Sequence, residues 1–313
     1  MNSLIVSLNA VLPFVLYMSF GYGVRRCGIA SMEFLRKLNA LVFTAFFPLM
    51  MFDNIYSMSS ETAISPSFML FSILSVIVVI LLSTLITARL VRDRQKVPVL
   101  IQGIYRSNIL LFAIPITRTM FGDGPVALAT ALVVLIVPIY NLSAVVLLEY
   151  FSGRERSSLL ELLRNIVMNP LVLGVLVGLA FRALGIQVPY TAMKVVRQYS
   201  DMTTPLALFI LGGTLEFGAM RKNMRYLIGI LVTKLMVVPA IMLLLGLALG
   251  FDAMERFVVF TLYATPVATA TFPMAQAMGA DAELAGEEVV LSTTLSVVTL
   301  FFWITLMQNM GMF

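Results

Sequence analysis

An all-helical integral membrane protein is the fold class that this sequence of 313 residues predicts. Hydrophobic residues make up 60% of the chain and charged residues only 12%, whereas a soluble domain carries roughly a quarter charged residues. A chain with so few charges lacks the polar surface that a water-soluble globule of this length needs. A lipid bilayer is therefore the solvent that suits it.

Long apolar runs divide the chain into ten predicted transmembrane helices, because a spanning helix needs about 20 predominantly apolar residues. We number them in chain order as predicted spans one to ten. The ranges are 4–24, 38–56, 68–88, 97–121, 125–150, 168–184, 202–220, 226–247, 257–278 and 288–307. The first run has no basic residue before it and no small-residue cleavage pattern after it, so it is predicted to be a retained helix.

The basic residues predict how these helices are oriented. Loops on one side of the predicted membrane hold 14 Lys and Arg residues, and loops on the other side hold 4. Because loops rich in Lys and Arg stay in the cytoplasm, both termini are predicted to be extracytoplasmic. The acidic loop 279–288 is predicted to be cytoplasmic. The net charge of +5 lies in short loops between apolar runs, so we expect no nucleic-acid partner.

The reactive residues exclude several kinds of site. The chain contains one cysteine, Cys27, and no histidine, so a disulfide within the chain and a Cys/His metal site are excluded. We therefore expect no metal and no cofactor. An enzyme active site is also not expected, because the predicted spans contain no nucleophile–base pair and no pair of carboxylates.

Turn and helix-breaking residues recur at a constant offset of 157 residues, which predicts an internal repeat. The matched pairs are Pro13 with Pro170, Gly21 with Gly178, Gly28 with Gly185, Pro48 with Pro205 and Gly122 with Gly279. Each half holds five predicted spans, an odd number, so the halves have opposite orientations in the membrane. The predicted organisation is a first repeat over 1–151, a short cytoplasmic linker over 152–167 and a second repeat over 168–313. Inverted repeats with a substrate site between them are typical of secondary transporters.

The fourth and ninth predicted spans carry proline and polar residues in mid-membrane, which predicts broken helices. A transmembrane proline frees a backbone carbonyl, and protein or a wet cavity has to satisfy it. The alternative is that these prolines only kink packed helices. The residues concerned are Ser107, Asn108 and Pro115 in the fourth span, and Thr265, Pro266, Thr269, Thr271 and Gln276 in the ninth.

The order and spacing of short motifs along nearly the whole chain resemble the auxin efflux carrier family. The motifs are Phe47-Pro48-Leu49, Ser107-Asn108 through Ile114-Pro115, Phe121-Gly122-Asp123, Asn169-Pro170, 208–212 and Thr265-Pro266 through Ala275-Gln276. The resemblance implies a fold like that of the bile-acid sodium symporters, with spans four and nine crossing at their breaks in a core of spans three to five and eight to ten. Spans one, two, six and seven would form a scaffold, and spans two and seven would form a homodimer.

The resemblance also implies part of the site and the branch of the family. The carboxylate-binding asparagine of the family matches Asn108, and the proline of its ninth helix matches Pro266. The long cytoplasmic loop of the plant carriers is short here, which indicates a bacterial permease of the malate or malonate type. The expected location is then the bacterial inner membrane, with the protein crossing it several times.

Ionisable residues within the predicted spans are costly and mark candidate functional groups. Arg106, Arg118 and Lys234 are all cationic, which favours an anionic substrate. The alternatives are that Arg118 snorkels to the outer surface and that Arg106 lies at the cytoplasmic end of its helix. Asp53 and Glu216 are coupling candidates near helix ends, although each is also expected to cap a helix or face water.

Together these features predict a secondary transporter that moves small organic anions, carboxylates in particular, by alternating access. Asn108, Thr265 and Thr269 are expected to contact the substrate, with Ser107 as a weaker candidate. Two alternatives are a sodium-coupled organic anion symporter of the bile-acid type and an anion channel of similar architecture. The ninth span lacks a carboxylate, which weakens the case for sodium, and coupling to protons or to sodium stays open.

Overall fold

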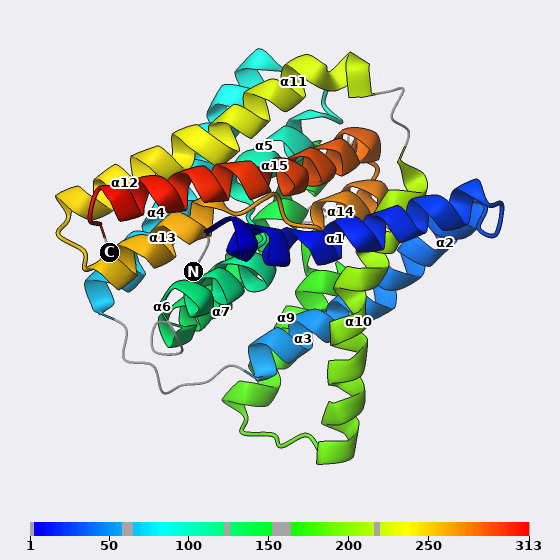
Figure 1. Ribbon diagram of the computed structural model, residues 1–313. Helices are drawn as coiled ribbons and strands as arrows, with labels where there is room; N and C mark the ends of the chain where they lie inside the picture. The colour runs from blue at the N-terminus through cyan, green and yellow to red at the C-terminus, as the bar shows by residue number, and fades with distance from the viewer. Residues whose placement is uncertain (1–2, 58–64, 122–125, 152–163, 216–219, 313) are drawn as a thin grey trace.

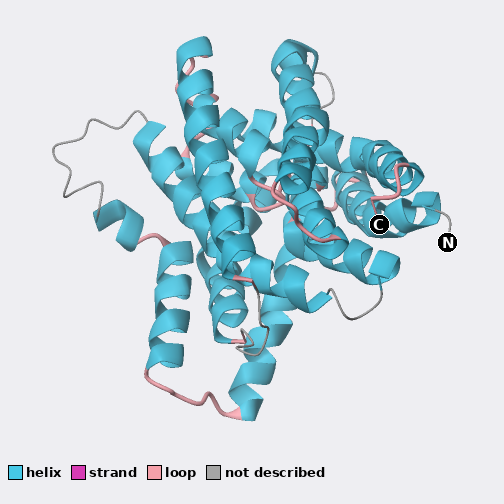
Figure 2. Cartoon of the chain, turned by 90° about the vertical axis from the view of Figure 1, so that its left-hand side faces the viewer, coloured by secondary structure: helices cyan, strands magenta, loops and turns pink. Residues whose placement is uncertain are grey.

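The computed structural model describes residues 3–57, 65–121, 126–151, 164–215 and 220–312, and these residues form an assembly of helices (Figure 1). The helices are α1 (Ser3–Arg26), α2 (Met32–Leu41), α3 (Phe47–Tyr56), α4 (Pro66–Leu90), α5 (Val97–Tyr105), α6 (Ile114–Phe121), α7 (Val126–Phe151), α9 (Pro170–Ala183), α10 (Tyr190–Thr214), α11 (Met220–Val232), α12 (Val238–Ala248), α13 (Ala253–Ala264), α14 (Thr271–Met278) and α15 (Ala282–Asn309). Within these ranges no strand is present, and loops only connect helices (Figure 2). The predicted all-helical class is confirmed for this part of the chain.

Several of these helices suit a bilayer by length and composition. Four continuous helical stretches of the described chain are long and apolar enough to cross one, namely Met32–Tyr56, Pro66–Leu90, Lys222–Ala248 and Ala282–Asn309. All ten predicted ranges overlap a helix, but the number of crossings stays a prediction. The predicted start of the seventh span at residue 202 is wrong for the helix itself, since α10 begins at Tyr190. The reason is that its added N-terminal turns carry Lys194 and Arg197, charges that a hydropathy criterion excludes.

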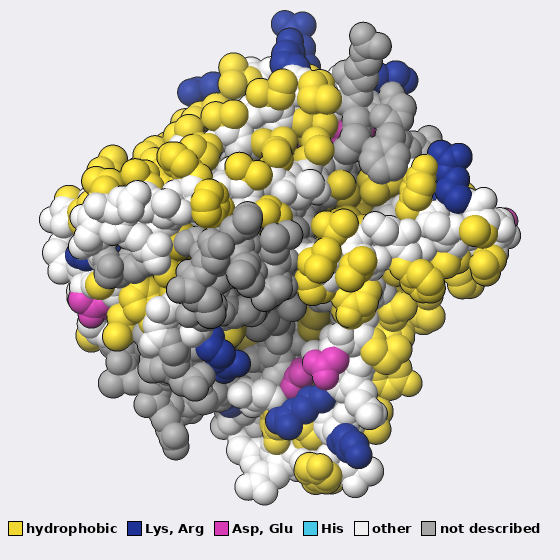
Figure 3. Space-filling view, in the orientation of Figure 1, with side chains coloured by type: hydrophobic (Ala, Val, Ile, Leu, Met, Phe, Trp, Pro, Cys, Tyr) yellow, Lys and Arg dark blue, Asp and Glu magenta, His cyan; other side chains and the backbone are white. Residues whose placement is uncertain are grey.

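The distribution of side chains on α4 shows which solvent the helix faces. Its large apolar residues point outward, with Leu70 57% and Leu81 62% exposed. Most of its hydroxyl residues point inward, and Ser72, Ser75, Ser83 and Thr87 are buried. A water-soluble helix has the opposite arrangement. Figure 3 shows apolar side chains spread over much of the visible surface, with charged side chains along its upper edge and sides and in a group on its lower part.

The helices pack in two groups that contact each other. One group consists of α1, α2, α3, α9 and α10, in which α1 packs on α10 and α3 packs on both α9 and α10 (Figure 1). The other group contains α4, α5 and α11 to α15, in which α4 packs on α5, α12 on α13 and α11 on α15. Helix α1 also packs on α15, which joins the two groups.

Glycines permit the closest helix contacts in the first group, and these contacts are reciprocal. A Cβ atom added at Gly21 of α1 would lie 1.9 Å from the carbonyl oxygen of Phe209 in α10. A Cβ atom added at Gly178 of α9 would lie 3.2 Å from the carbonyl oxygen of Phe52 in α3. The offset of 157 residues converts the first pair into the second. The close approach of these backbones therefore requires glycine at equivalent places in both halves of the chain.

Three stretches of π-helix each precede a proline. They are η1 (Val42–Phe46), η2 (Ile109–Ala113) and η3 (Thr233–Val237), followed by Pro48, Pro115 and Pro239. A proline has no N–H for the carbonyl four residues before it, and a local π turn is one way for the helix to adjust. For Pro239 that carbonyl belongs to Leu235, and the indole N–H of Trp303 in α15 donates to it at 2.9 Å. A neighbouring helix thus satisfies the group that the proline frees.

Candidate functional site

Two helix interruptions meet inside the second group of helices. Helix α5 ends at Tyr105 and η2 begins at Ile109, while α13 ends at Ala264 and α14 begins at Thr271. The extended segments between them pair as an antiparallel bridge between Ser107 and Val267. The N–H of Asn108 donates to the carbonyl of Pro266 at 2.9 Å, and the N–H of Ala268 donates to the carbonyl of Arg106 at 3.1 Å.

The sequence explains the second interruption more directly than the first. Pro266 disfavours the helical conformation for the residue before it, and Thr265 has an extended backbone with φ −74° and ψ 153°. The first interruption lies at residues 106–108, whereas Pro115 lies inside α6. The break was expected at Pro115. It lies about two helical turns earlier, and η2 separates it from Pro115.

A cavity adjoins this junction of interrupted helices. The cavity has a volume of about 70 Å³, is partly open to the surface, and lies between the junction and helices α3, α7 and α10. Its polar lining comes from Asn54, Arg106, Ser107, Asn108, Tyr140, Asn141, Thr204 and Thr269, and its apolar lining from Phe47, Met50, Met51, Ile109 and Val137, among others. Four of the sequence-predicted residues, Arg106, Ser107, Asn108 and Thr269, therefore line one cavity.

Arg106 is buried beside this cavity, with 2% of its surface exposed. Its guanidinium donates to the side-chain amide oxygen of Gln102 at 3.0 Å and to that of Asn141 at 2.5 Å. It also donates to the sulfur of Met274 at 2.9 Å. No carboxylate is among its partners in the described part of the chain. Arg106 is buried where α5 ends, at the interruption, whereas Arg118 is exposed.

Lys234 is a second buried cation at the same junction. It lies in η3 and its side chain is fully buried. Its ammonium group donates to the hydroxyl of Ser107, its one hydrogen-bond partner among the described residues. Ser292 of α15 holds the other strand of the junction, because its hydroxyl accepts from the N–H of Val267 at 3.1 Å. Contacts from η3, through Lys234, and from α15, through Ser292, thus hold the two segments of the junction in place.

Unpartnered polar atoms concentrate among the sequence-predicted residues. Within the described structure, Asn108 Nδ2, Thr265 Oγ1 and Thr271 Oγ1 are buried and have no hydrogen-bond partner. Buried polar atoms in proteins are nearly always hydrogen-bonded, so exceptions call for an explanation such as a missing ligand. Asn108 is the clearest case, because its unpaired amide belongs to a residue that lines the cavity.

The other predicted residues lie away from this cavity. Thr271 begins α14 without lining it, and Gln276 lines a second cavity of about 230 Å³ between α2, α10, α14 and α15. Asp53 accepts from the hydroxyl of Ser57 at 2.8 Å and pairs with Arg197 at 3.8 Å, a local role at the end of α3. Glu216 and Asp123 lie outside the described residues.

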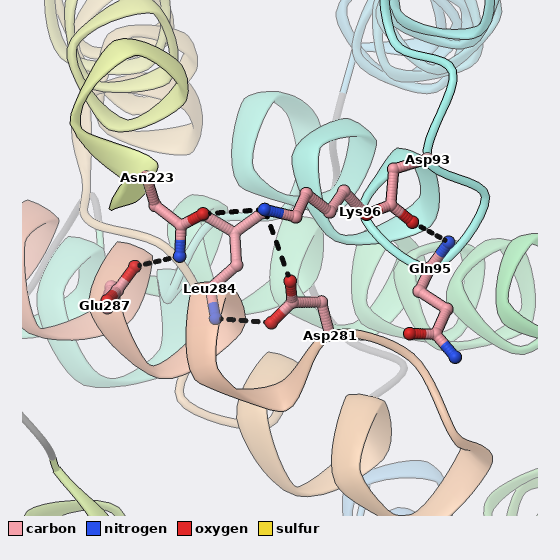
Figure 4. Close-up of polar contacts among 7 residues, drawn as sticks. All are labelled: Asp93, Gln95, Lys96, Asn223, Asp281, Leu284 and Glu287. Atoms are coloured by element: carbon pink, nitrogen blue, oxygen red, sulfur yellow. Dashed lines mark hydrogen bonds and ion pairs between the residues drawn. The ribbon is translucent and has the colours of Figure 1, made fainter. Parts of the chain in front are cut away.

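The sequence reasoning missed two buried carboxylates, Glu287 and Glu288. It assigned residues 279–288 to a loop, which is wrong because α15 begins at Ala282 and buries both side chains. Glu287 accepts from the amide of Asn223 at 2.8 Å, and Asn223 in turn accepts from Lys96 at 2.8 Å (Figure 4). The sequence signal was the spacing of Glu288, Ser292 and Ser296 by four residues, which places them on one face of a helix.

The comparison with known proteins identifies the family. A family model described as "Membrane transport protein" matches residues 6–304. The chain belongs to this family. The predicted resemblance to the auxin efflux carriers is thereby confirmed.

One relative of this transporter carries a substrate in its name. A protein of Rhizobium meliloti (strain 1021) named "Putative malonate transporter" is 28% identical over 142 residues. The match covers 45% of the transporter and 44% of that relative, so less than half of either chain is compared.

Proposed function

We propose that this transporter moves small organic anions, in particular carboxylates, across the membrane by alternating access. The observation that carries the proposal is the pair of buried cations, Arg106 and Lys234, at the junction of the interrupted helices. A buried charge is costly unless an opposite charge neutralises it, and no carboxylate contacts either side chain in the described structure. An anion in the adjoining cavity supplies the missing negative charge.

Neutral donors at the junction would orient that anion. The unpaired amide of Asn108 offers hydrogen bonds to a carboxylate without adding charge. Thr265 has an unpaired hydroxyl and Thr269 lines the cavity, and the hydroxyl of Ser107 is shared with Lys234. The name of the Rhizobium relative supports a dicarboxylate such as malonate as the first substrate to test.

The proposed architecture has ten spans in two inverted repeats, 1–151 and 168–313, joined by the linker 152–167. The reciprocal glycine contacts support this arrangement, as do the left-handed glycines Gly28 and Gly185, which follow α1 and α9 at the same offset. The group of α1, α2, α3, α9 and α10 would be the scaffold, and the other group would be the core that moves. The cavity lies between the two groups, where alternating access would expose it to each side in turn.

We also propose that the protein resides in the bacterial inner membrane with both termini extracytoplasmic. It would form a homodimer through its second and seventh spans. Labelling of single cysteines in a Cys27→Ala background tests the orientation. We expect membrane-impermeant reagents added outside to label a cysteine at position 184 and to leave one at position 93 unlabelled. The opposite pattern would reverse the orientation. Cross-linking between cysteines on α3 and α10 of two subunits tests the dimer.

Uptake by purified protein in proteoliposomes tests the transport proposal. We expect saturable uptake of labelled malonate or a related carboxylate, and we expect Arg106→Gln to abolish it. The exposed Arg225→Gln is the matched control and should retain uptake. A requirement for a sodium gradient would favour the sodium symporter, and flux without counterflow exchange would favour the channel. Absence of carboxylate uptake under all gradients would refute the proposal.

A further inference from the structure

Glu288 is the most isolated ionisable side chain of α15. It is fully buried, and neither of its carboxyl oxygens has a hydrogen-bond partner in the described structure. Its Oε2 lies where a side chain at Gly103 would begin, since a Cβ atom there would be 2.6 Å from Oε2 and 2.9 Å from Ile230. The glycine of α5 thus makes room for a carboxyl group among apolar neighbours.

The three residues at this site, Gly103, Ile230 and Glu288, each lie one helical turn before a residue that contacts the junction. Gly103 precedes Ser107 by four residues in the same chain segment, and Ile230 precedes Lys234 by four residues. Glu288 itself precedes Ser292 by four residues. Ser107 bonds to Lys234 and Ser292 bonds to the junction backbone. Glu288 therefore belongs to a layer of side chains one helical turn, a backbone rise of about 6 Å, before the residues that contact the junction.

A chain of polar contacts connects Glu287, the residue before Glu288, with the surface. Glu287, the neighbour of Glu288, bonds to Asn223, and Asn223 bonds to Lys96 (Figure 4). Lys96 pairs with Asp281 at 3.8 Å, and these two side chains are 21% and 19% exposed. The second oxygen of Glu287 has no partner. Glu287 also lines the second cavity, of about 230 Å³, which Gln276 lines too, so water has access to the start of this route.

Several elements that pack against α15 carry titratable groups, and the charges of Asp281 and Glu287 act on Glu288 directly. From α5 and its ends the titratable groups are Lys96, Tyr105 and Arg106, and from α11 and η3 they are Lys222, Arg225, Tyr226 and Lys234. Those of α15 and the residue before it are Asp281, Glu283 and Glu287. Helix α1 carries Tyr17, Tyr22, Arg25 and Arg26, and α13 carries Glu255, Arg256 and Tyr263. Helix α14 carries no titratable group. Among these, Lys234 and Arg106 are the cations buried at the junction, where the proposed anion binds.

We propose that Glu288 is the proton-binding group that couples anion transport to the proton gradient. With the cavity empty, the positive charges of Lys234 and Arg106 favour the ionised carboxylate of Glu288. An anion in the cavity neutralises those charges, and Glu288 then takes up one proton through the route past Glu287. The anion and the proton favour each other's binding, which is the thermodynamic requirement for symport. This inference rests on the proposed function.

A proton suits Glu288 better than a metal cation. A hard cation such as Ca²⁺ takes six or more oxygen ligands, and Mg²⁺ requires six. The described side chains contain no cluster of three or more acidic, histidine or cysteine residues able to hold a metal ion. The space beside Oε2 is bordered by Gly103 and Ile230, neither of which has a side-chain oxygen. A proton needs only the carboxyl group itself.

Malonate binding to the purified full-length protein tests the inference by calorimetry. Between about pH 7 and about pH 8.5 malonate is a dianion, so its own titration does not contribute. We expect its affinity for the unmodified protein to fall by up to about tenfold per pH unit, with about one proton taken up per malonate bound. Glu288→Gln, which mimics the protonated state, should bind malonate independently of pH. In proteoliposomes it should exchange malonate but no longer accumulate it in response to a pH gradient.

The variants and outcomes separate this inference from the proposed function. Glu283→Gln removes an exposed carboxylate about one and a half turns away on the same helix and should behave like the unmodified protein. Glu288→Asp keeps a carboxyl group and should keep the pH dependence, which covers the case in which Glu288→Gln does not fold. Malonate binding that does not vary with pH overturns the inference alone, as does normal pH dependence in folded Glu288→Gln. Absence of malonate binding at every pH overturns the proposed function instead.

Discussion

Replacement of Asn108 by alanine separates a substrate-binding role from a structural one. The backbone N–H of Asn108 holds the junction through its bond to Pro266, and the alanine variant keeps that bond. The side-chain amide Nδ2 is buried without a hydrogen-bond partner, so its removal costs no described bond and relieves one unpaired donor. The folded state should therefore be at least as stable in Asn108→Ala.

The expected loss of affinity follows from the bond that the amide would make to a carboxylate. A hydrogen bond to a charged group contributes about 1.5–3 kcal/mol, which corresponds to a loss of roughly 10-fold to 150-fold in affinity. Asn108→Asp should lose more, because it places a negative charge against an anion. Each variant is assayed for malonate binding by calorimetry and for thermal unfolding in detergent.

Asn165→Ala is the matched control for this prediction. The Asn165 amide donates to Glu149 at 2.8 Å, away from the cavity, and its removal should leave malonate affinity unchanged. Full malonate affinity in a well-folded Asn108→Asp protein would remove Asn108 from the site. A parallel loss of stability and affinity in Asn108→Ala would assign the residue a purely structural role.

Two further substitutions test the packing of the helices. Gly212→Ala would place a Cβ atom 1.9 Å from the carbonyl oxygen of Met18, so we expect a loss of stability of about 1–3 kcal/mol or more. The control Gly229→Ala, at a position with open space, should be neutral or slightly stabilising. Equal melting temperatures of the two variants would refute the close approach of α1 and α10. Trp303→Phe leaves the Leu235 carbonyl that Pro239 frees without its donor, so we expect a loss of about 1–3 kcal/mol, and an unchanged melting temperature would show that this bond contributes nothing.

Local chemistry explains why much of the fold was predictable. Apolar runs predicted helices over most of their length, because the bilayer selects composition regardless of which helices become neighbours. Pro266 predicted an extended residue before it, because the proline ring acts only on adjacent backbone. The break near Asn108 was expected in the correct helix, yet its position came from pairing with a segment more than 150 residues away.

Predictions failed for charged residues whose burial depends on how the helices pack. Residues 279–288 were assigned to a loop because acidic residues are rare in membrane helices, but α5 provides a glycine-lined space that accepts Glu288. Lys234 was a candidate on depth alone, and its pairing with Ser107 depends on how α5 packs against η3. No periodicity in the sequence contains that information.

The sequence by itself determined the solvent, the helical class and the family of this transporter, since these depend on composition and on motifs in chain order. The tertiary structure decided which polar residues share a cavity and which carboxylates are buried. The physical reason is that hydrogen bonds and charge burial depend on distances of a few ångströms between segments far apart in the chain, and those distances exist only once the helices have packed.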